Sequence, residues 1–379
     1  MAITITKQPG KISLAGNPIL VSASSNLFVD KLFRKACIDV GVKVHIEGGT
    51  ALETYTFPLS QPIVDGTVIF DISSCLRSVL SSIDIYRLGH EYAMPSVSYS
   101  FKVWDEYMDE DGNLVSTKDT AKKIDGFFAI PGSYTEVQRT KLSDNISKTF
   151  GQSCIMSNKP LSLEPYPVGI APIIPIYSDS SEDAHVYVDG AQMQSIAIQR
   201  IKSKRVVSGY VNDSLFPISV GVHTVRIGDA NPVERSYCVI PSQASQVCFD
   251  FVNRLGGIEN VVCYSRVGRK DLLSMAKYVR YQGKAFRPEG GAFNRMLSRE
   301  SVCTMSTGPL TREWAEWFMQ DFFTSGRWWM KFEGEYIPVC VSLSDNTVLY
   351  TGDKAELIDI PFEVSFAMEG VPSVSPFGL

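Results

Sequence analysis

The chain of 379 residues has few of the side chains from which catalytic and metal sites are built. It contains only four histidines, at positions 45, 90, 185 and 223, and no two of them are close in sequence. His-x-His and His-Glu-x-x-His patterns are absent, so no strand or helix offers a ready pair of metal-ligating imidazoles. His45 and His223 lie inside alternating segments, which favours a structural role for both. The sequence therefore predicts no metal site, no cofactor and no catalytic histidine.

Motifs that hold phosphate groups or activate a nucleophile are also missing. There is no G-x-S-x-G elbow, no P-loop and no G-x-G-x-x-G before a helix. The glycine pairs at 48–49, 256–257 and 290–291 lack the lysine or the strand–helix setting of a phosphate loop, so we expect turns there. We predict that the protein is not an enzyme. An enzyme of another type is kept as an alternative, because two of the 41 acidic residues would suffice for a glycosidase.

The chain also lacks signs of oxidation, membrane insertion or an overall basic charge. Its eight cysteines form no Cys-x-x-Cys pair and are irregularly spaced, which favours reduced, buried thiols. No apolar stretch reaches the roughly 18 residues of a membrane helix. The segment Met1–Thr6 shows no signal peptide, so we expect synthesis in the cytoplasm. A net charge of −5 argues against nucleic acid as the main partner.

Short alternating runs separated by turn residues predict a mainly β protein with a few helices, a β-rich α+β class. At this length several domains are expected, built from antiparallel sandwiches or barrel-like sheets. We place a β-rich domain at 1–160, a small immunoglobulin-like β module at 170–241 and an α+β domain at 246–379. The proline-rich stretch 161–175 is the best candidate for a linker.

The first domain is predicted to contain one short helix and a long hairpin. Asp71 can cap a helix over Ile72–Ser82, whose apolar residues form one stripe. The run Val97–Val103 alternates as a strand does and leads to an acidic tip at Asp105–Asn113. A calcium loop counted from Asp109 would need glycine at its sixth position and glutamate at its twelfth, and neither is present. We therefore expect a solvated hairpin tip.

The central module carries the strongest short hairpin signal of the chain. Asp189-Gly190 separates two alternating runs, a pattern typical of a two-residue β-turn. The run Gly221–Val225 resembles the late strands of small immunoglobulin-like modules. That resemblance covers about seventy residues and implies a sandwich of short strands.

The C-terminal domain begins its most distinctive segment with an aromatic helix. Thr311 can cap it and Gly326 can end it, and an apolar stripe is formed by Trp314, Trp317, Phe318 and Phe322. We expect this stripe to pack on the C-terminal sheet. The following Trp328-Trp329 pair starts a strand that places one indole on each face. The outward tryptophan is a candidate interface anchor.

The run Ile358–Met368 alternates apolar and other residues over about twice the usual strand length. Pro361 cannot donate to a strand ladder, which indicates an edge position or a bulge. A long edge strand with one apolar face requires a cover, and we expect a neighbouring subunit to provide it. The candidate interface residues are Trp328, Trp329, Pro361, Phe362, Val364 and Phe366.

Three segments give the chain a resemblance to virion proteins of tailed phages, or prophages, of Bacteroides-type bacteria. They are Ile12–Ile19 with Val68–Leu76, then Phe251–Gly257, and finally the terminal helix and strand pair. The resemblance implies a structural tail protein of the distal tip or baseplate, located in the virion and forming a closed, commonly sixfold ring. Its implied partners are other copies of itself and neighbouring virion proteins, and no catalytic residues are carried over.

The alternative from a different class is a multi-domain glycan- or protein-binding protein that uses exposed aromatic side chains on the central module. An exposed aromatic platform there would favour this alternative, and a homo-oligomer would favour the structural role.

Overall fold

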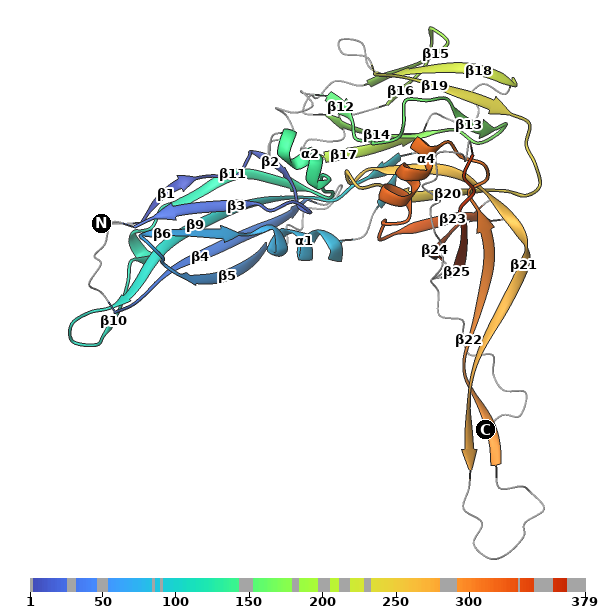
Figure 1. Ribbon diagram of the computed structural model, residues 1–379. Helices are drawn as coiled ribbons and strands as arrows, with labels where there is room; N and C mark the ends of the chain where they lie inside the picture. The colour runs from blue at the N-terminus through green and yellow to red at the C-terminus, as the bar shows by residue number, and fades with distance from the viewer. Residues whose placement is uncertain are drawn as a thin grey trace, which may run out of the picture. The chain divides into compact units, whose positions relative to one another are not determined.

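The computed structural model shows a mainly β, multi-domain protein with a few helices (Figure 1). It describes residues 3–25, 32–45, 54–83, 86–88, 91–142, 153–178, 184–196, 205–210, 219–227, 233–279, 292–332, 335–343 and 357–366. The chain forms two compact units. The first comprises 1–164, 171–239 and 253–259, and the second 165–170, 240–252 and 260–379. These two units differ from the three domains expected at 1–160, 170–241 and 246–379 and do not test that division, which stays a prediction.

The first unit contains two sheets that share one hydrophobic core. One has the strand order β1-β3-β6 and the other β2-β11-β9-β4-β5, with β10 paired to β9. All these pairings are antiparallel except that of β2 with β11. The strands are β1 (Thr4–Lys7), β2 (Ile12–Leu14), β3 (Leu20–Ser24), β4 (Leu32–His45), β5 (Thr54–Pro62), β6 (Thr67–Asp71), β9 (Ser96–Met108), β10 (Leu114–Ser116) and β11 (Lys123–Ile130).

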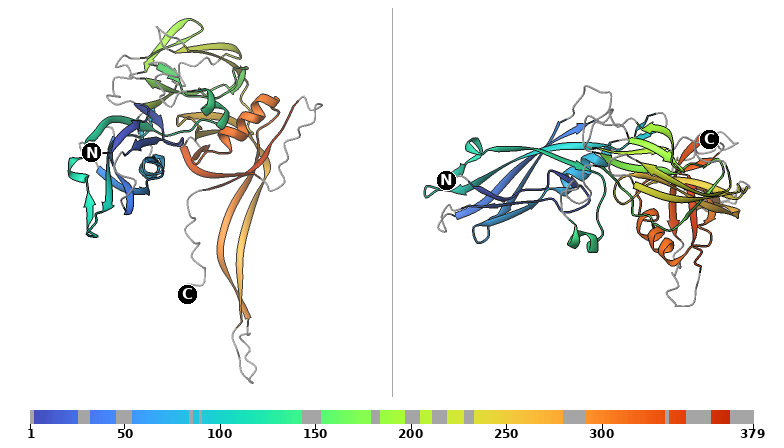
Figure 2. Two further views of the ribbon diagram at one scale, coloured as in Figure 1. Left: turned by 60° about the vertical axis from the view of Figure 1, so that its left-hand side comes forward. Right: turned by 90° about the horizontal axis from the view of Figure 1, so that it is seen from above.

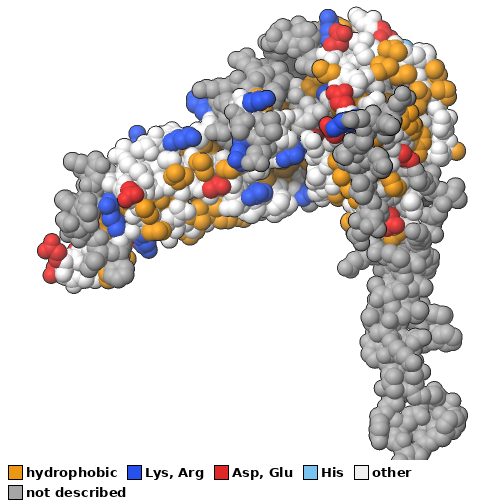
Figure 3. Space-filling model, viewed as in Figure 1, with side chains coloured by type: hydrophobic (Ala, Val, Ile, Leu, Met, Phe, Trp, Pro, Cys, Tyr) orange, Lys and Arg blue, Asp and Glu red, His pale blue; other side chains and the backbone are white. Residues whose placement is uncertain are grey.

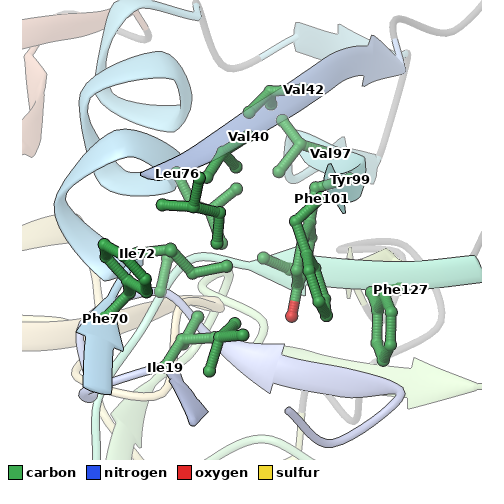
Figure 4. Packing of buried hydrophobic residues seen from close by; sticks show 14 of the residues in the cluster. Ile19, Val40, Val42, Phe70, Ile72, Leu76, Val97, Tyr99, Phe101 and Phe127 are labelled. Carbon is green, nitrogen blue, oxygen red and sulfur yellow. The ribbon is translucent and has the colours of Figure 1, made fainter. Parts of the chain in front are cut away.

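Period-two alternation decides which side of these strands enters the core. In β4, Ile38, Val40 and Val42 are fully buried, while Asp39 and Lys43 between and beside them reach the other face. Tyr99 and Phe101 of β9 enter the same core and stack on Phe127 of β11 with centroid distances of 5.4 Å (Figure 4). The alternation expected for Val97–Val103 is confirmed.

The expected helix α1 (Ser73–Ser82) covers this core. Asp71 lies just before the helix, and its Oδ1 accepts hydrogen bonds from the backbone N–H groups of Ser73 and Ile19, both at 3.0 Å. Ile72 and Leu76 are fully buried, as Figure 4 shows. One carboxylate thus satisfies a free N–H at the helix start and ties the helix to β3.

Two further sheets belong largely to the first unit. One has the order β12-β14-β17-β8-β7, and the other contains the neighbouring strands β19-β18-β15-β16. The strands are β7 (Tyr86–Leu88), β8 (Glu91–Ala93), β12 (Ser153–Ile155), β14 (Ile173–Ser178), β15 (Ala184–Val188), β16 (Ala191–Ile196), β17 (Arg205–Tyr210), β18 (Gly221–Ile227) and β19 (Val233–Ile240). The Asp189-Gly190 turn joins β15 to β16 with both residues at positive φ, as expected. The short helices are η1 (Lys118–Thr120) and α2 (Glu136–Lys141).

The proline-rich stretch 161–175 is not a free linker, which corrects the expectation from sequence. It contains β13 (Glu164–Pro167), at the boundary between the two units, and enters β14. β14 pairs with both β12 and β17, and residues 171–177 are buried. Proline favours extended backbone in a strand as well as in a linker, so composition alone did not distinguish the two.

The second unit is a closed barrel with the strand order β20-β21-β22-β25-β24-β23. The strands are β20 (Gln246–Val252), β21 (Ile258–Val279), β22 (Ala292–Ser306), β23 (Trp328–Phe332), β24 (Glu335–Leu343) and β25 (Pro361–Phe366). Helix α4 (Arg312–Trp317) continues as a π-helical turn over Phe318–Phe322. Its aromatic side chains pack with the buried strand residues in one core, which confirms the helix packed on the C-terminal sheet.

Candidate assembly surfaces

The terminal strand is not an edge strand, which corrects the argument that singled it out. β25 pairs with β22 on one side and with β24 on the other, over residues 361–366 and 362–366. Pro361 is its first residue, a position at which proline is tolerated without a bulge. Strand alternation identifies the buried face correctly, but it does not say which strands lie alongside. The ladder partners were therefore unpredictable from this segment.

Two of the expected interface residues lie inside the barrel. Phe362 and Val364 are 1% and 3% exposed and belong to the barrel core. The Phe362 ring contacts Phe249, Phe322 and Phe323 edge-on, with centroid distances of 6.0, 5.9 and 5.4 Å. Phe366 pairs in register with Val339, and Met368 lies outside the described residues. β25 therefore contributes core packing in place of a contact surface.

The two tryptophans of β23 occupy opposite faces, as expected. Trp328 packs against the barrel core and donates its indole N–H to the carbonyl of Phe322 at 2.9 Å. Trp329 is half-buried and does not belong to that core; its Cα is opposite Asp250 and Pro338 in the two ladders. Trp329 and Pro361 are half-buried outside that core, and the side chain of Phe366 is not described, so these three of the six stay candidates.

The feature that sequence reasoning missed is a long two-stranded ribbon in the second unit. β21 has 22 residues and β22 has 15, and they pair from Tyr264↔Ser306 out to Val279↔Ala292. β25 joins β22 only from Val302 onward. β20 has seven residues and precedes β21 by five, so its pairing reaches no further than about Tyr264. Figures 1 and 2 show β21 and β22 continuing together beyond the barrel.

Within the described chain, the ribbon over 271–279 and 292–301 therefore has two strands and two unpaired outer edges. Nine residues of β21 span about 30 Å at about 3.3 Å per residue. An isolated two-stranded hairpin is marginally stable in water, and exposed edges can pair with another chain. The sequence signal was weak because this segment does not alternate cleanly between apolar and polar residues.

The first unit has a polar hollow of about 370 Å³ on the sheet face opposite its core. Its lining includes the small residues Gly41, Ser98 and Ser100 and the charged residues Asp39, Lys43, Lys102, Lys123 and Asp125. Asp39 is paired with Lys118 at 2.8 Å.

The glycan-binding alternative expects an exposed aromatic side chain on the central module. None appears among the side chains described there, since Tyr187 is half-buried and Tyr237 is buried.

His223 has a defined hydrogen-bond partner. Its Nδ1 lies 2.7 Å from Oδ2 of Asp189, the residue of the β15–β16 turn. The hydrogen bond with Asp189 raises the pKa of His223, and the same bond, with one from the Thr224 N–H, lowers the pKa of Asp189. This pair fixes β18 to the adjacent turn, a structural role. Among the described residues no three His, Cys, Asp or Glu side chains form a metal-binding group.

The cysteines whose side chains are described are free thiols, as expected. Cys37, Cys75, Cys248 and Cys263 are buried, and Cys340 is exposed. Burial raises the pKa of Cys37 to about 11 and that of Cys248 well above its usual value. These buried thiols are therefore protonated and unreactive at neutral pH.

The comparisons with known proteins identify no family. No protein-family model and no curated protein sequence matches the chain. Among solved structures, the chain is similar to titin domains Z1Z2 in complex with telethonin, with 11% identity, 64% of this chain and 97% of that chain covered, and a TM-score of 0.16. A chimeric titin Z1Z2 carrying a decorin peptide matches at 10% identity over the same shares, with a TM-score of 0.15. Within the described residues, no helix combines the length and apolar character needed to cross a membrane.

Proposed function

We propose that this chain is a non-enzymatic structural subunit that forms a ring in a phage tail or a related particle. The observation that carries the proposal is the ribbon of β21 and β22, which extends past the barrel with both outer edges unpaired within the described chain. An element of this kind gains stability when a neighbouring subunit covers it. The resemblance to tail proteins supplies the setting of the particle.

The energetic argument for a covering subunit rests on backbone hydrogen bonds. Along one edge of nine residues, about every second residue presents its N–H and C=O outward. Pairing such an edge with another chain would add several hydrogen bonds, each with a net contribution of about 0.5–1.5 kcal/mol. The sum is of the order of several kcal/mol for one edge, which offsets part of the about 4–15 kcal/mol that association costs in lost freedom of motion, so side-chain contacts must supply the rest.

Trp329 supports the same proposal from the barrel. Tryptophan is enriched among the residues that anchor protein–protein interfaces, and Trp329 is half-buried outside the hydrophobic core. Phe362 and Val364 no longer support it, because they stabilise the barrel itself. The glycan-binding alternative stays a prediction, since it depends on aromatic residues such as Phe216 that lie outside the described residues.

The test is electron microscopy of the purified full chain, alone and as the Trp329→Ala variant. We expect closed rings for the natural sequence and fewer or smaller assemblies for the variant, with unchanged circular dichroism. Leu357→Ala is the matched control, because Leu357 is an exposed apolar residue outside the barrel strands, at 60% exposure. Well-dispersed single subunits at all concentrations would refute the ring.

A further inference from the structure

The ribbon differs sharply in charge from the rest of the chain. Its strands, over 265–279 and 292–301, contain six Lys or Arg residues and two Asp or Glu residues, a net charge of +4. The complete chain has a net charge of −5, so the remainder carries −9. A basic element on an acidic protein attracts acidic surfaces, and a second copy of the same chain offers such a surface.

The most acidic short segment is the turn between β9 and β10 in the first unit. From Val103 to Thr117 there are five acidic residues and no Lys or Arg. Asp105 accepts a hydrogen bond from Ser25, Glu106 pairs with Lys35 at 2.9 Å, and Asp109 accepts hydrogen bonds from the backbone N–H groups of Asp111 and Asn113. Residues 109–111 form the turn itself, and Figure 3 shows acidic side chains gathered at this end.

The same turn also presents a strand edge. β10 pairs with β9 alone among the described strands, with Leu114 opposite Met108. Leu114 is 64% exposed at the beginning of this short strand. Among the described strands, the β9–β10 hairpin therefore offers negative charge, an apolar side chain and unpaired backbone groups in one place, and the ribbon offers positive charge and two unpaired edges.

We infer that the basic β21–β22 ribbon of one copy docks on the acidic β9–β10 hairpin of a neighbouring copy, which rests on the ring assembly proposed above. Two ribbons of net +4 repel each other, so a symmetric ribbon-to-ribbon contact is disfavoured. A contact between two different surfaces of the same chain is heterologous, and repeated heterologous contacts generate a ring when the rotation closes. The charge distribution thus selects a head-to-tail arrangement.

A two-stranded basic ribbon also has dimensions that fit the major groove of duplex DNA. The overall negative charge of the chain opposes binding to a polyanion, whereas it favours a contact with an acidic copy. Binding of duplex DNA is therefore measured beside self-association in the same experiment.

The test uses charge reversal in the full chain. The ribbon variant carries Lys277→Glu, Arg295→Glu and Arg299→Glu, far from the barrel pairings. The hairpin variant carries Glu110→Lys and Asp111→Lys, which leave the turn-forming Asp109 in place. Matched controls reverse exposed charges elsewhere: Lys7→Glu, Lys11→Glu and Lys141→Glu, or Asp125→Lys and Glu234→Lys. Mass photometry gives the self-association of each, and circular dichroism checks the fold.

Each charge-reversed variant alone is expected to associate at least tenfold more weakly than the natural sequence, while the controls associate normally. Mixing the two variants restores assembly, because the ribbon of one, at net −2, then meets the turn 109–111 of the other, whose net charge changes from −3 to +1, and the restored rings contain the two variants in equal numbers. Raising salt to about 1 M, where the Debye length is about 3 Å, weakens the natural assembly. If a glutamate variant unfolds, the glutamine triple variant at the same three positions replaces it.

Four results would overturn the inference. Normal association of both variants would remove the contact and leave the ring proposal standing. Failure of the mixture to assemble would remove the hairpin as the partner of the ribbon. Loss of duplex DNA affinity in the ribbon variant, with association unchanged, would assign the ribbon to nucleic acid. If the natural sequence itself stays monomeric, the ring proposal fails, and the inference fails with it.

Discussion

Replacing Phe362 by alanine distinguishes a core position from an interface position. Phe362 is 1% exposed, and its ring has three aromatic neighbours with centroids at 5.4 to 6.0 Å. A buried phenylalanine replaced by alanine costs about 3–5 kcal/mol. Edge-on ring contacts contribute beyond the buried area, so we place the loss for Phe362→Ala at about 4–5 kcal/mol. A unit of this size would then unfold about 10–20 °C lower.

The assay is urea unfolding followed by tryptophan fluorescence. Four of the five tryptophans lie in the second unit, and Trp104 lies in the first. In a Trp104→Phe background the emission therefore reports the second unit alone. Measurements at several protein concentrations separate unfolding from dissociation, because an oligomer's stability depends on concentration. Leu357→Ala is the control, with an expected change within about 0.5 kcal/mol.

The reasoning is refuted if Phe362→Ala lowers the free energy of unfolding by less than about 1 kcal/mol while it weakens self-association. That combination would place Phe362 at a contact between subunits, as the prediction of an edge strand from the sequence implied. It would contradict the burial of Phe362 in the barrel core.

Two other substitutions test local features of the first unit. Gly256 and Gly112 both have positive φ, at +86° and +79°, but a Cβ at Gly256 would clash with the carbonyl oxygen of Pro131, whereas Gly112 has open space around it. Gly112→Ala therefore costs only the backbone strain, about 1–2 kcal/mol. Gly256→Ala should lower the free energy of unfolding, measured by thermal unfolding, at least twice as much. The His223–Asp189 pair raises the pKa of His223 and lowers that of Asp189, so its stabilisation is greatest between about pH 4 and 6.5 and is lost as pH rises through the folded pKa of His223 or falls through that of Asp189. Unfolding of Asp189→Asn across this range should show the largest deficit near pH 5, and a deficit independent of pH would contradict the pairing.

Local features of the fold were predictable from short stretches of sequence. Asp189-Gly190 has the residue types that a tight turn with positive φ requires, and the turn is present. Asp71 precedes an apolar stripe at helical spacing, and it accepts a hydrogen bond from the first helical N–H group. Thr311 is at the predicted helix start, although its side chain accepts no cap hydrogen bond there. In each case the physical cause lies within a few residues along the chain.

Features that depend on distant pairing were not predictable. The alternation around Phe362 identifies its buried face, but the closure of the barrel depends on β22 and β24, which no local pattern specifies. The ribbon lacks clean alternation, so no local pattern predicts its 22-residue strand. Its clearest sequence signal is the excess of Lys and Arg over 265–301, a property of charge and not of periodicity.

The most direct test of the central claim is native mass spectrometry of the full chain at low salt, from about 1 to about 100 µM. The account predicts one closed assembly with a mass that is an integer multiple of 42.0 kDa, and the resemblance to tail proteins sets the expected multiple at six. The multiple should not increase further with concentration, because a closed ring has no free contact surface left. A 42.0 kDa monomer throughout this range would contradict the account, and so would an open series of masses that grows with concentration.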